Sequence, residues 1–231
     1  MVLGAKMCKL GIEQVMIFSY IRQSKPCYED LHLHHAFATL LTSCSKPSSQ
    51  PKPIEPDDPN SVTIDGTKYP VIKYGNQRWT VVNYNGSGGA NYNDSPSNDP
   101  KYGKLYTHNE ALAIKLPNGW RLPTTNDYQI LITPYQSNIK DLMSKTGWIE
   151  KLGTNELGFN VFPVGYKFAF EYIYDHVGYE SSFLTTSFNE EGTHRGFFNF
   201  ISYSGTAGAG IFYVPKNDDQ DRASIRFVKD E

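Results

Sequence analysis

Residues 118–128 read NGWRLPTTNDY, and the rest of the chain is arranged around this stretch. Pro117 ends the helix signal before it, because proline lacks a backbone donor and clashes with the preceding turn. The Asn-Gly pair then supplies a turn, because these residues adopt positive φ at little energetic cost. Thr124 is a good N-cap, and Asp127 stands where it can return a hydrogen bond to the cap, as in a capping box. The stretch therefore predicts two helices separated by a turn.

Further helices are predicted on either side. Residues 107–110 read THNE, a regular capping box that opens a helix extending to Leu116. The helix that begins at the central stretch should close at Pro134. A third short helix is expected from Ser137 to Gly147.

Strand patterns fill most of the remaining chain. An Asp-Gly turn predicts a hairpin over residues 62–74, and a strand over 77–83 follows it. The segment 204–210, which is rich in glycine, reads as a bulged turn between strands. Later strands are expected at 165–172, 181–187, 196–202, 210–214 and 224–228. The count favours an α+β domain with antiparallel sheets and two or three short helices in its first half.

Composition excludes several classes of protein. The formal net charge is −2 and no basic stripe is present, so we expect no nucleic-acid partner. All three cysteines lie within residues 1–44, so the later domain has no disulfide, thiolate metal site or cysteine nucleophile. The metalloprotease and nucleophile-elbow motifs are absent, and the histidines of the domain are scattered. We therefore expect no enzyme, with a hydrolase built from dispersed carboxylates as the alternative.

Residues 41–44 read LTSC, which has the form of a bacterial lipobox. This pattern predicts lipidation of Cys44 after removal of residues 1–43 as a signal peptide and upstream segment. The apolar run before it is short and follows histidines where a Lys/Arg-rich region is usual. Residues 1–29 resemble neither a signal nor a folded domain, which suggests a wrongly assigned start or a frameshift. The alternative is a cytoplasmic chain with a chance Leu-Thr-Ser-Cys.

A tether follows the predicted lipidation site. Residues 45–60 read SKPSSQPKPIEPDDPN, and their repeated prolines and few apolar side chains favour an extended, semi-stiff segment. Residues 44–60 would then hold a domain at 61–231 away from the bilayer. The several acyl chains of a mature lipoprotein anchor firmly. We therefore expect an outer-membrane protein on the cell surface or the periplasmic face.

One loop combines side chains that suit a sugar or a protein surface. Residues 171–180 read EYIYDHVGYE, which brings aromatic faces, carboxylates and a histidine together. Binding residues are often carried by loops on a rigid scaffold. The predicted ligand-binding residues are Glu171, Tyr172, Tyr174, Asp175, His176, Tyr179 and Glu180. The alternative is a solvated loop with tyrosines packed beneath it.

A second polar cluster is a candidate metal site. Residues 217–221 read NDDQD, and calcium prefers carboxylate and carbonyl oxygens. The candidate ligands are Asn217, Asp218, Asp219 and Asp221. The alternative is an ordinary polar turn, and we expect no cofactor unless calcium binds here.

Seven short motifs follow one another along the domain. They read IDGTKY (64–69), IKYGNQRW (72–79), GKLYT (103–107), PNGWRLPT (117–124), NELGF (155–159), PVGYK (163–167) and SIRFVKD (224–230). In order and spacing they resemble the Fibrobacter succinogenes major paralogous domain family, which is common among lipoproteins of Bacteroidetes and Fibrobacteres. Leu116 and Phe227 stand where that family usually has cysteines.

The central and closing motifs also look like the C-type-lectin-like fold, especially its branch with formylglycine-generating enzymes. The resemblance implies two helices flanking an antiparallel sheet, paired termini and a long loop region that carries the binding surface. Formylglycine chemistry needs reactive cysteines, which the domain lacks.

The leading hypothesis is a cell-envelope lipoprotein with a non-catalytic ligand-binding or adhesion module. Its ligand would be a carbohydrate or a surface protein, and its lipid anchor would make the membrane a further partner. One alternative is a structural or accessory subunit of a surface assembly such as fimbriae. The other is an enzyme of unknown hydrolytic type.

Overall fold

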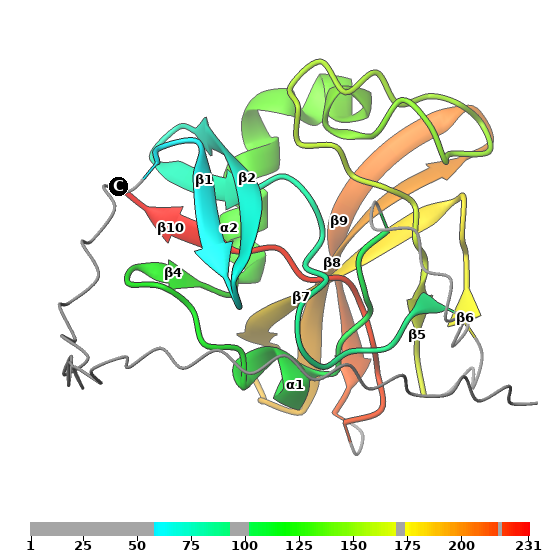
Figure 1. Ribbon diagram of the computed structural model, residues 1–231. Coiled ribbons are helices and arrows are strands. Elements are labelled where there is room, and N and C mark those ends of the chain that lie inside the picture. Colours follow the sequence, from blue (N-terminus) through cyan, green and yellow to red (C-terminus); the bar gives the residue numbers. More distant parts are fainter. Residues whose placement is uncertain (1–57, 93–101, 170–173, 217–218) are drawn as a thin grey trace, which may run out of the picture. The chain divides into compact units, whose positions relative to one another are not determined.

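The structure, a computed structural model, describes residues 58–92, 102–169, 174–216 and 219–231 (Figure 1). Its strands are β1 (Ser61–Ile64), β2 (Thr67–Tyr74), β3 (Gln77–Thr80), β4 (Trp120–Arg121), β5 (Tyr166–Lys167), β6 (Tyr174–Asp175), β7 (Glu180–Phe188), β8 (His194–Tyr203), β9 (Thr206–Pro215) and β10 (Val228–Asp230). Its helices are α1 (His108–Leu112), α2 (Thr125–Ile132) and the 3₁₀ helix η2 (Thr133–Leu142). All ladders between these strands are antiparallel. The predicted α+β class with antiparallel sheets is confirmed.

The first sheet has the strand order β1-β2-β3-β10-β4. Asp65 and Gly66, with φ of 49° and 75°, make the turn between β1 and β2, as the Asp-Gly pair predicted. The late strand β10 lies between β3 and β4, with Val228 opposite both Trp79 and Arg121. This strand begins four residues later than residue 224, where the sequence pattern placed its start.

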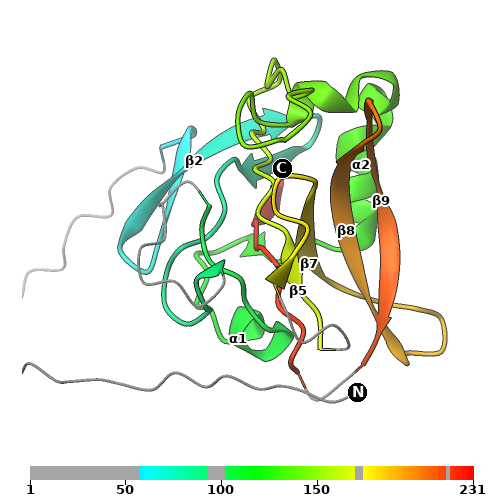
Figure 2. The same cartoon turned by 90° about the vertical axis from the view of Figure 1, so that its right-hand side faces the viewer.

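The second sheet has the order β7-β8-β9 (Figure 2). Ser204 and Gly205 have φ of 52° and 76°, which gives the two-residue turn that suits the twist of a hairpin. β8 and β9 then pair without a register shift from Tyr203↔Thr206 to His194↔Pro215. The predicted bulged turn over 204–210 is therefore wrong: only its first two residues turn, because the chain pairs with β8 again at once.

Both predicted capping boxes are present. Thr107 and Glu110 cap α1, and Thr124 and Asp127 cap α2, with side chain and backbone bonded in both directions. α1 ends at Leu112, short of the predicted Leu116. None of the helices in the described ranges has the length and apolar character needed to span a bilayer.

The predicted third helix takes a different form. α2 ends at Ile132, and Pro134 then lies in the first turn of η2, where a missing N–H costs little. Asn138 interrupts η2 with non-helical angles. The segment after α2 is thus a kinked 3₁₀ stretch, and the single helix expected from Ser137 to Gly147 is wrong.

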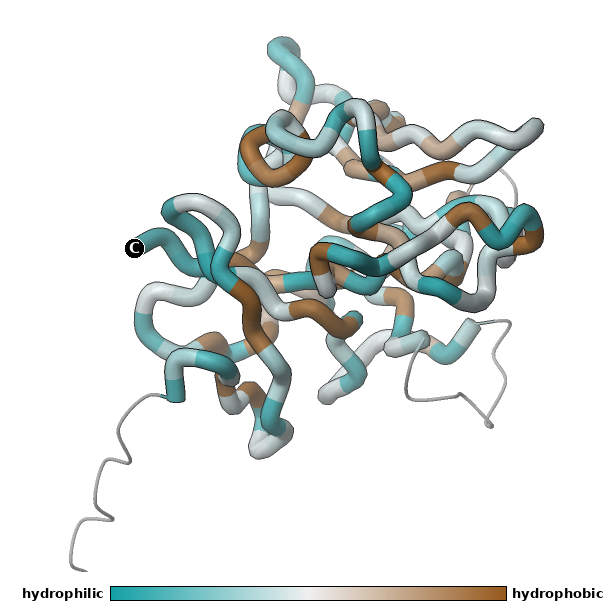
Figure 3. Tube along the Cα trace, turned by 90° about the horizontal axis from the view of Figure 1, so that it is seen from above, coloured by the Kyte–Doolittle hydropathy of each residue, from teal (hydrophilic) through white to brown (hydrophobic). Residues whose placement is uncertain are grey.

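Aromatic side chains join α2 to the second sheet. The ring of Tyr128 stacks on that of Phe198 at 4.7 Å and also contacts Trp79 at 4.8 Å. All three side chains are fully buried, as expected for large apolar residues. Figure 3 shows hydrophobic and hydrophilic stretches interleaved along the chain.

One buried cation joins distant parts of the core. Arg226 is 1% exposed and donates to the Asn83 side chain (2.9 Å) and the carbonyls of Phe159 (2.6 Å) and Asn160 (3.0 Å). Its guanidinium also lies 4.7 Å from the centre of the Phe159 ring. Burial lowers the pKa of Arg226 to about 10, which still leaves it charged at neutral pH.

Candidate binding site

The loop predicted to bind ligand is partly described. Glu171 and Tyr172 lie outside the described residues. Tyr174 and Asp175 form β6, which pairs with β5, and only their backbone is described. His176, Tyr179 and Glu180 lie together at the start of β7. The described residues of the predicted loop therefore lie close together, beside the second sheet.

Aromatic rings form a continuous array at this place. The Tyr166 hydroxyl is 2.8 Å from His176 Nδ1, and the two rings stack at 5.2 Å. His176 meets Tyr203 edge-on at 6.3 Å. Tyr203 stacks on Tyr179 at 5.2 Å with an interplanar angle of 2°. The array runs from buried Tyr166 to half-exposed Tyr179, so it presents aromatic surface on a buried base.

Polar side chains lie on the face of the β7-β8-β9 sheet that also carries Tyr203. Ser182 lies opposite Asn199, and Asn199 lies opposite Gly210 on β9. The neighbouring row contains Glu180, Ile201 and Gly208. Cross-strand partners share one face of a sheet, so these side chains are neighbours.

Hydrogen bonds hold the carboxylate of this face in place. Glu180 Oε1 accepts from Asn199 Nδ2 (2.9 Å) and from Ser182 Oγ (3.1 Å). Oε2 of the same carboxylate bonds to no described residue. No described atom lies within 4 Å of the place a side chain at Gly210 would begin, so the sheet is open beside Asn199. Glu180 is 9% exposed, and the side chains of His176, Tyr179, Asn199 and Tyr203 are half-buried. We call these five residues the aromatic–polar surface.

A second carboxylate supports the edge of this surface. Glu150 Oε2 accepts from the Gly205 N–H (2.9 Å) and from Ser202 Oγ (3.3 Å). These bonds join the segment before β5 to the β8–β9 turn next to Tyr203. Neither Glu150 nor the β8 residues Asn199 and Tyr203 were predicted. The two-residue alternation of β8 was the signal available for placing Asn199 and Tyr203 on one face.

The candidate calcium ligands lie elsewhere. Asn217 and Asp218 are outside the described residues. Asp219 Oδ1 pairs with Arg195 at 3.0 Å, and Asp219 also accepts the Asn109 N–H at the start of α1. Burial opposes ionisation of Asp219, but hydrogen bonds from Thr107 and Asn109 outweigh it and lower its pKa. This carboxylate already has a cationic partner.

Asp221 differs from Asp219 in its burial and its hydrogen bonds. It is 1% exposed, its Oδ1 accepts the Ala169 N–H (2.8 Å), and its buried Oδ2 has no hydrogen-bond partner among the described residues. Burial raises the pKa of Asp221. No group of three or more His, Cys, Asp or Glu side chains in the described ranges is placed to hold a metal ion. Calcium binding at residues 217–221 stays a prediction.

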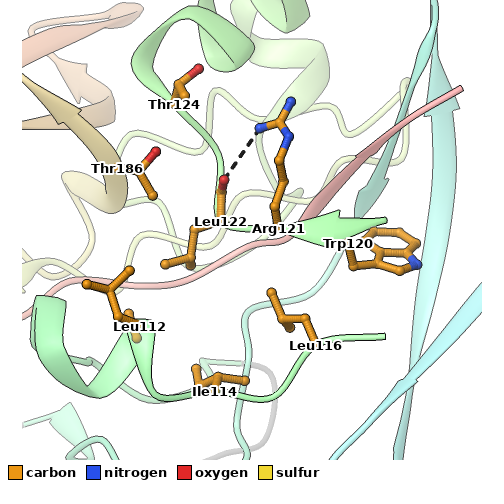
Figure 4. Close-up of a pocket in the computed structure, with 9 residues that line it drawn as sticks. Leu112, Ile114, Leu116, Trp120, Arg121, Leu122, Thr124 and Thr186 are labelled. Atoms are coloured by element: carbon orange, nitrogen blue, oxygen red, sulfur yellow. Dashed lines mark hydrogen bonds between the residues drawn. The ribbon is translucent and has the colours of Figure 1, made fainter. Parts of the chain in front are cut away.

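An open apolar pocket lies on the other side of the central stretch (Figure 4). It has a volume of about 420 Å³. Its apolar walls come from α1, the segment after it, and β4, and they consist of Ala111, Leu112, Ile114, Leu116, Trp120 and Leu122. Arg121 lies at its edge and pairs with Asp127 (2.6 Å) and Asp230 (2.7 Å). Its charge is therefore already neutralised.

The sequence comparisons identify a family. The sequence model of the Fibrobacter succinogenes major domain matches residues 60–229. The chain belongs to this family. The resemblance of the seven motifs is thereby confirmed. No protein of curated function and no solved structure matches the chain.

Three motifs of the Fibrobacter succinogenes major domain meet in one polar cluster. Arg121 donates to both oxygens of Asp127 (2.6 and 2.9 Å). Gln77 Nε2 donates to Asp127 Oδ1 (2.7 Å) and to Asp230 Oδ1 (3.2 Å). Burial disfavours the charge of Asp127, but Arg121 and Thr124 outweigh it and hold its pKa at about 2. Together with Asp127, these motif residues join β3, β4, α2 and β10, which gives them a structural role.

Proposed function

We propose that this protein is a cell-envelope lipoprotein whose domain binds carbohydrate without catalysis. The ligand would lie on the aromatic–polar surface. Cys44 would carry the lipid, and residues 45–60 would form the tether to the outer membrane. We also propose that the antiparallel α+β domain has the C-type-lectin-like arrangement that the motifs resemble.

The pairing of stacked tyrosines with a fixed carboxylate carries this proposal. Sugar rings offer apolar C–H faces and hydroxyl edges, so they suit an aromatic ring next to hydrogen-bonding groups. Tyr179 and Tyr203 supply the ring faces, and Glu180 with Asn199 supplies an acceptor and a donor. These groups already contact one another, so little side-chain entropy would be lost on binding.

The open floor of the sheet supports the same ligand. Gly210 brings no side chain to the face beside Asn199, and no described atom covers it. A flat ring can approach bare β-strand backbone there more closely than it could approach a side chain. Glu180 Oε1 is engaged by two donors, and we assign this carboxylate to hydrogen bonding with ligand hydroxyls.

A glycan array tests the proposal, using the whole chain made soluble by Cys44→Ser, with and without calcium. We expect binding to one class of sugar, and a fall of about tenfold or more in affinity for Tyr203→Ala or Asn199→Ala. Tyr213→Ala is the matched control, because Tyr213 is an exposed tyrosine on the opposite face of the same sheet. A blank array from protein that melts cooperatively would contradict carbohydrate binding.

The apolar pocket favours a second candidate, a protein ligand within a surface assembly such as fimbriae. Leu112 at its mouth is 57% exposed, and pockets of this kind accept the apolar anchor of a partner. Purification of native complexes from envelopes separates this candidate from the first. Loss of a co-purifying protein in Leu112→Asp, with glycan binding unchanged, would assign the pocket to that partner.

A further inference from the structure

β9 is the outer strand of the second sheet and pairs only with β8 among the strands that the structure describes (Figure 2). In a hairpin closed by two residues, the flanking pair Tyr203 and Thr206 is hydrogen-bonded, and bonded and non-bonded pairs then alternate. Bonds next to the ladder agree with this alternation: the Ser202 N–H and the His194 carbonyl both bond on the β7 side.

The alternation leaves one row of backbone groups pointing away from the sheet. Ala207, Ala209, Ile211 and Tyr213 belong to non-bonded pairs, so their N–H and C=O groups face outward from β8. No described residue bonds to these groups. The outer edge of β9 can therefore accept another strand.

β9 has one residue of the kind that protects a sheet edge, Pro215, and it stands at the last position of the strand, where an antiparallel copy of β9 centred on Gly210 would set it opposite the turn residue Gly205. Proteins usually protect a sheet edge with charged residues, proline or a bulge. Residues 206–214 contain no charged residue and no proline, and they pair with β8 without a register shift. Ile211 and Tyr213 are also 39% and 46% exposed, which adds apolar surface beside the open edge.

The strand is complementary to itself in one register. If two β9 strands lie antiparallel and are centred on Gly210, Ala209 faces Ile211 of the other copy, and Ala207 faces its Tyr213. This register brings Ala207, Ala209, Ile211 and Tyr213 into bonded pairs. It also sets each large exposed side chain opposite an alanine. On the other face, Phe212 lies opposite Gly208, so large and small residues again alternate.

We infer that a second copy of this chain binds along β9. The two copies join their three-stranded sheets into one continuous sheet, with a twofold axis beside Gly210. Such an interface is isologous, since every contact occurs twice with the roles of the copies exchanged. This inference does not depend on the carbohydrate proposal.

Disulfide trapping tests the register. The test uses the whole chain with Cys8, Cys27 and Cys44 changed to serine. In the proposed register, the cysteine of Gly210→Cys lies opposite the same cysteine of the second copy, in a non-bonded pair. The Cα atoms of such a pair lie about 4.5 Å apart, which is within the range of a disulfide. No described atom obstructs a side chain at this position. We expect a covalent dimer under mild oxidation.

Gly208→Cys is the matched control on the same strand and face. Its new thiol faces Phe212 of the second copy and lies roughly 14 Å from its equivalent, too far for a disulfide. Equal cross-linking of both variants, or none with Gly210→Cys, overturns the proposed register.

Sedimentation measurements test the surface itself. We expect the parent protein to form a dimer in a concentration-dependent manner. The Ile211→Lys variant should be a monomer, because a lysine at a sheet edge opposes strand pairing. Ile130→Lys, at a 50% exposed position on α2, should remain dimeric. A monomeric parent protein, or a dimer unaffected by Ile211→Lys, overturns the inference.

Discussion

Arg226 shows how strongly a single residue can depend on distant parts of the chain. Its guanidinium bonds to Asn83, Phe159 and Asn160 and packs on the Phe159 ring. Arg226→Lys keeps the charge but replaces a planar fork with a point donor, which leaves buried carbonyls unpaired. We expect the free energy of unfolding in urea to fall by about 3 kcal/mol.

Arg222→Lys is the control for Arg226→Lys. Arg222 pairs with Glu110 at 2.7 Å, and both side chains are partly exposed. Solvent screens such a pair, so we expect a loss of at most about 1 kcal/mol. A similar loss from both substitutions would show that the buried hydrogen bonds of Arg226 contribute no more than an exposed ion pair.

At the scale of elements, Asp127 connects a helix cap to a sheet. Its folded pKa of about 2 lies below its usual 3.8, so its stabilising effect is complete above about pH 4 and is lost as the pH falls toward 2. We expect Asp127→Asn to cost about 2 kcal/mol at pH 7 and much less at pH 2, measured by urea unfolding.

The exposed carboxylate of Asp58 supplies the control for this prediction. Its pKa is also lowered to about 2, first by the hydrogen bond from Lys68, but solvent surrounds it. Asp58→Asn should change the pH dependence of stability far less. An Asp127→Asn protein whose acid-side decline matches that of the parent would show that this carboxylate does not govern the decline.

Elements governed by neighbouring residues were predictable from the sequence. Both capping boxes span four residues, so Thr107 and Thr124 identified the starts of their helices correctly. The start of η2 at Thr133 was not predicted, because a proline that ends one helix can also begin the next. In the candidate binding site, His176, Tyr179 and Glu180 could be proposed together because they share a loop. Asn199 and Gly210 were missed because strand register, set at the Ser204 turn, brings them there.

At the scale of the whole molecule, the proposed lipid anchor would decide where the domain works. Cys44→Ala removes the predicted acylation site, and residues 45–60 give the chain no other apolar segment next to it. We expect this variant to leave the membrane fraction on cell fractionation. Cys27→Ala, which changes a cysteine outside the lipobox, should stay with the membrane. Full membrane attachment of Cys44→Ala would contradict the lipoprotein proposal.

The central position of β10 has a consequence for how the protein is made. β1, β2 and β3 leave the ribosome early, but the strand that joins them to β4 comes from residues 228–230. Pairings this distant in sequence carry a high loop-closure cost and form slowly. The first sheet cannot close before those residues have been synthesised. Until then the first sheet stays incomplete, which would suit the export that we propose for this protein.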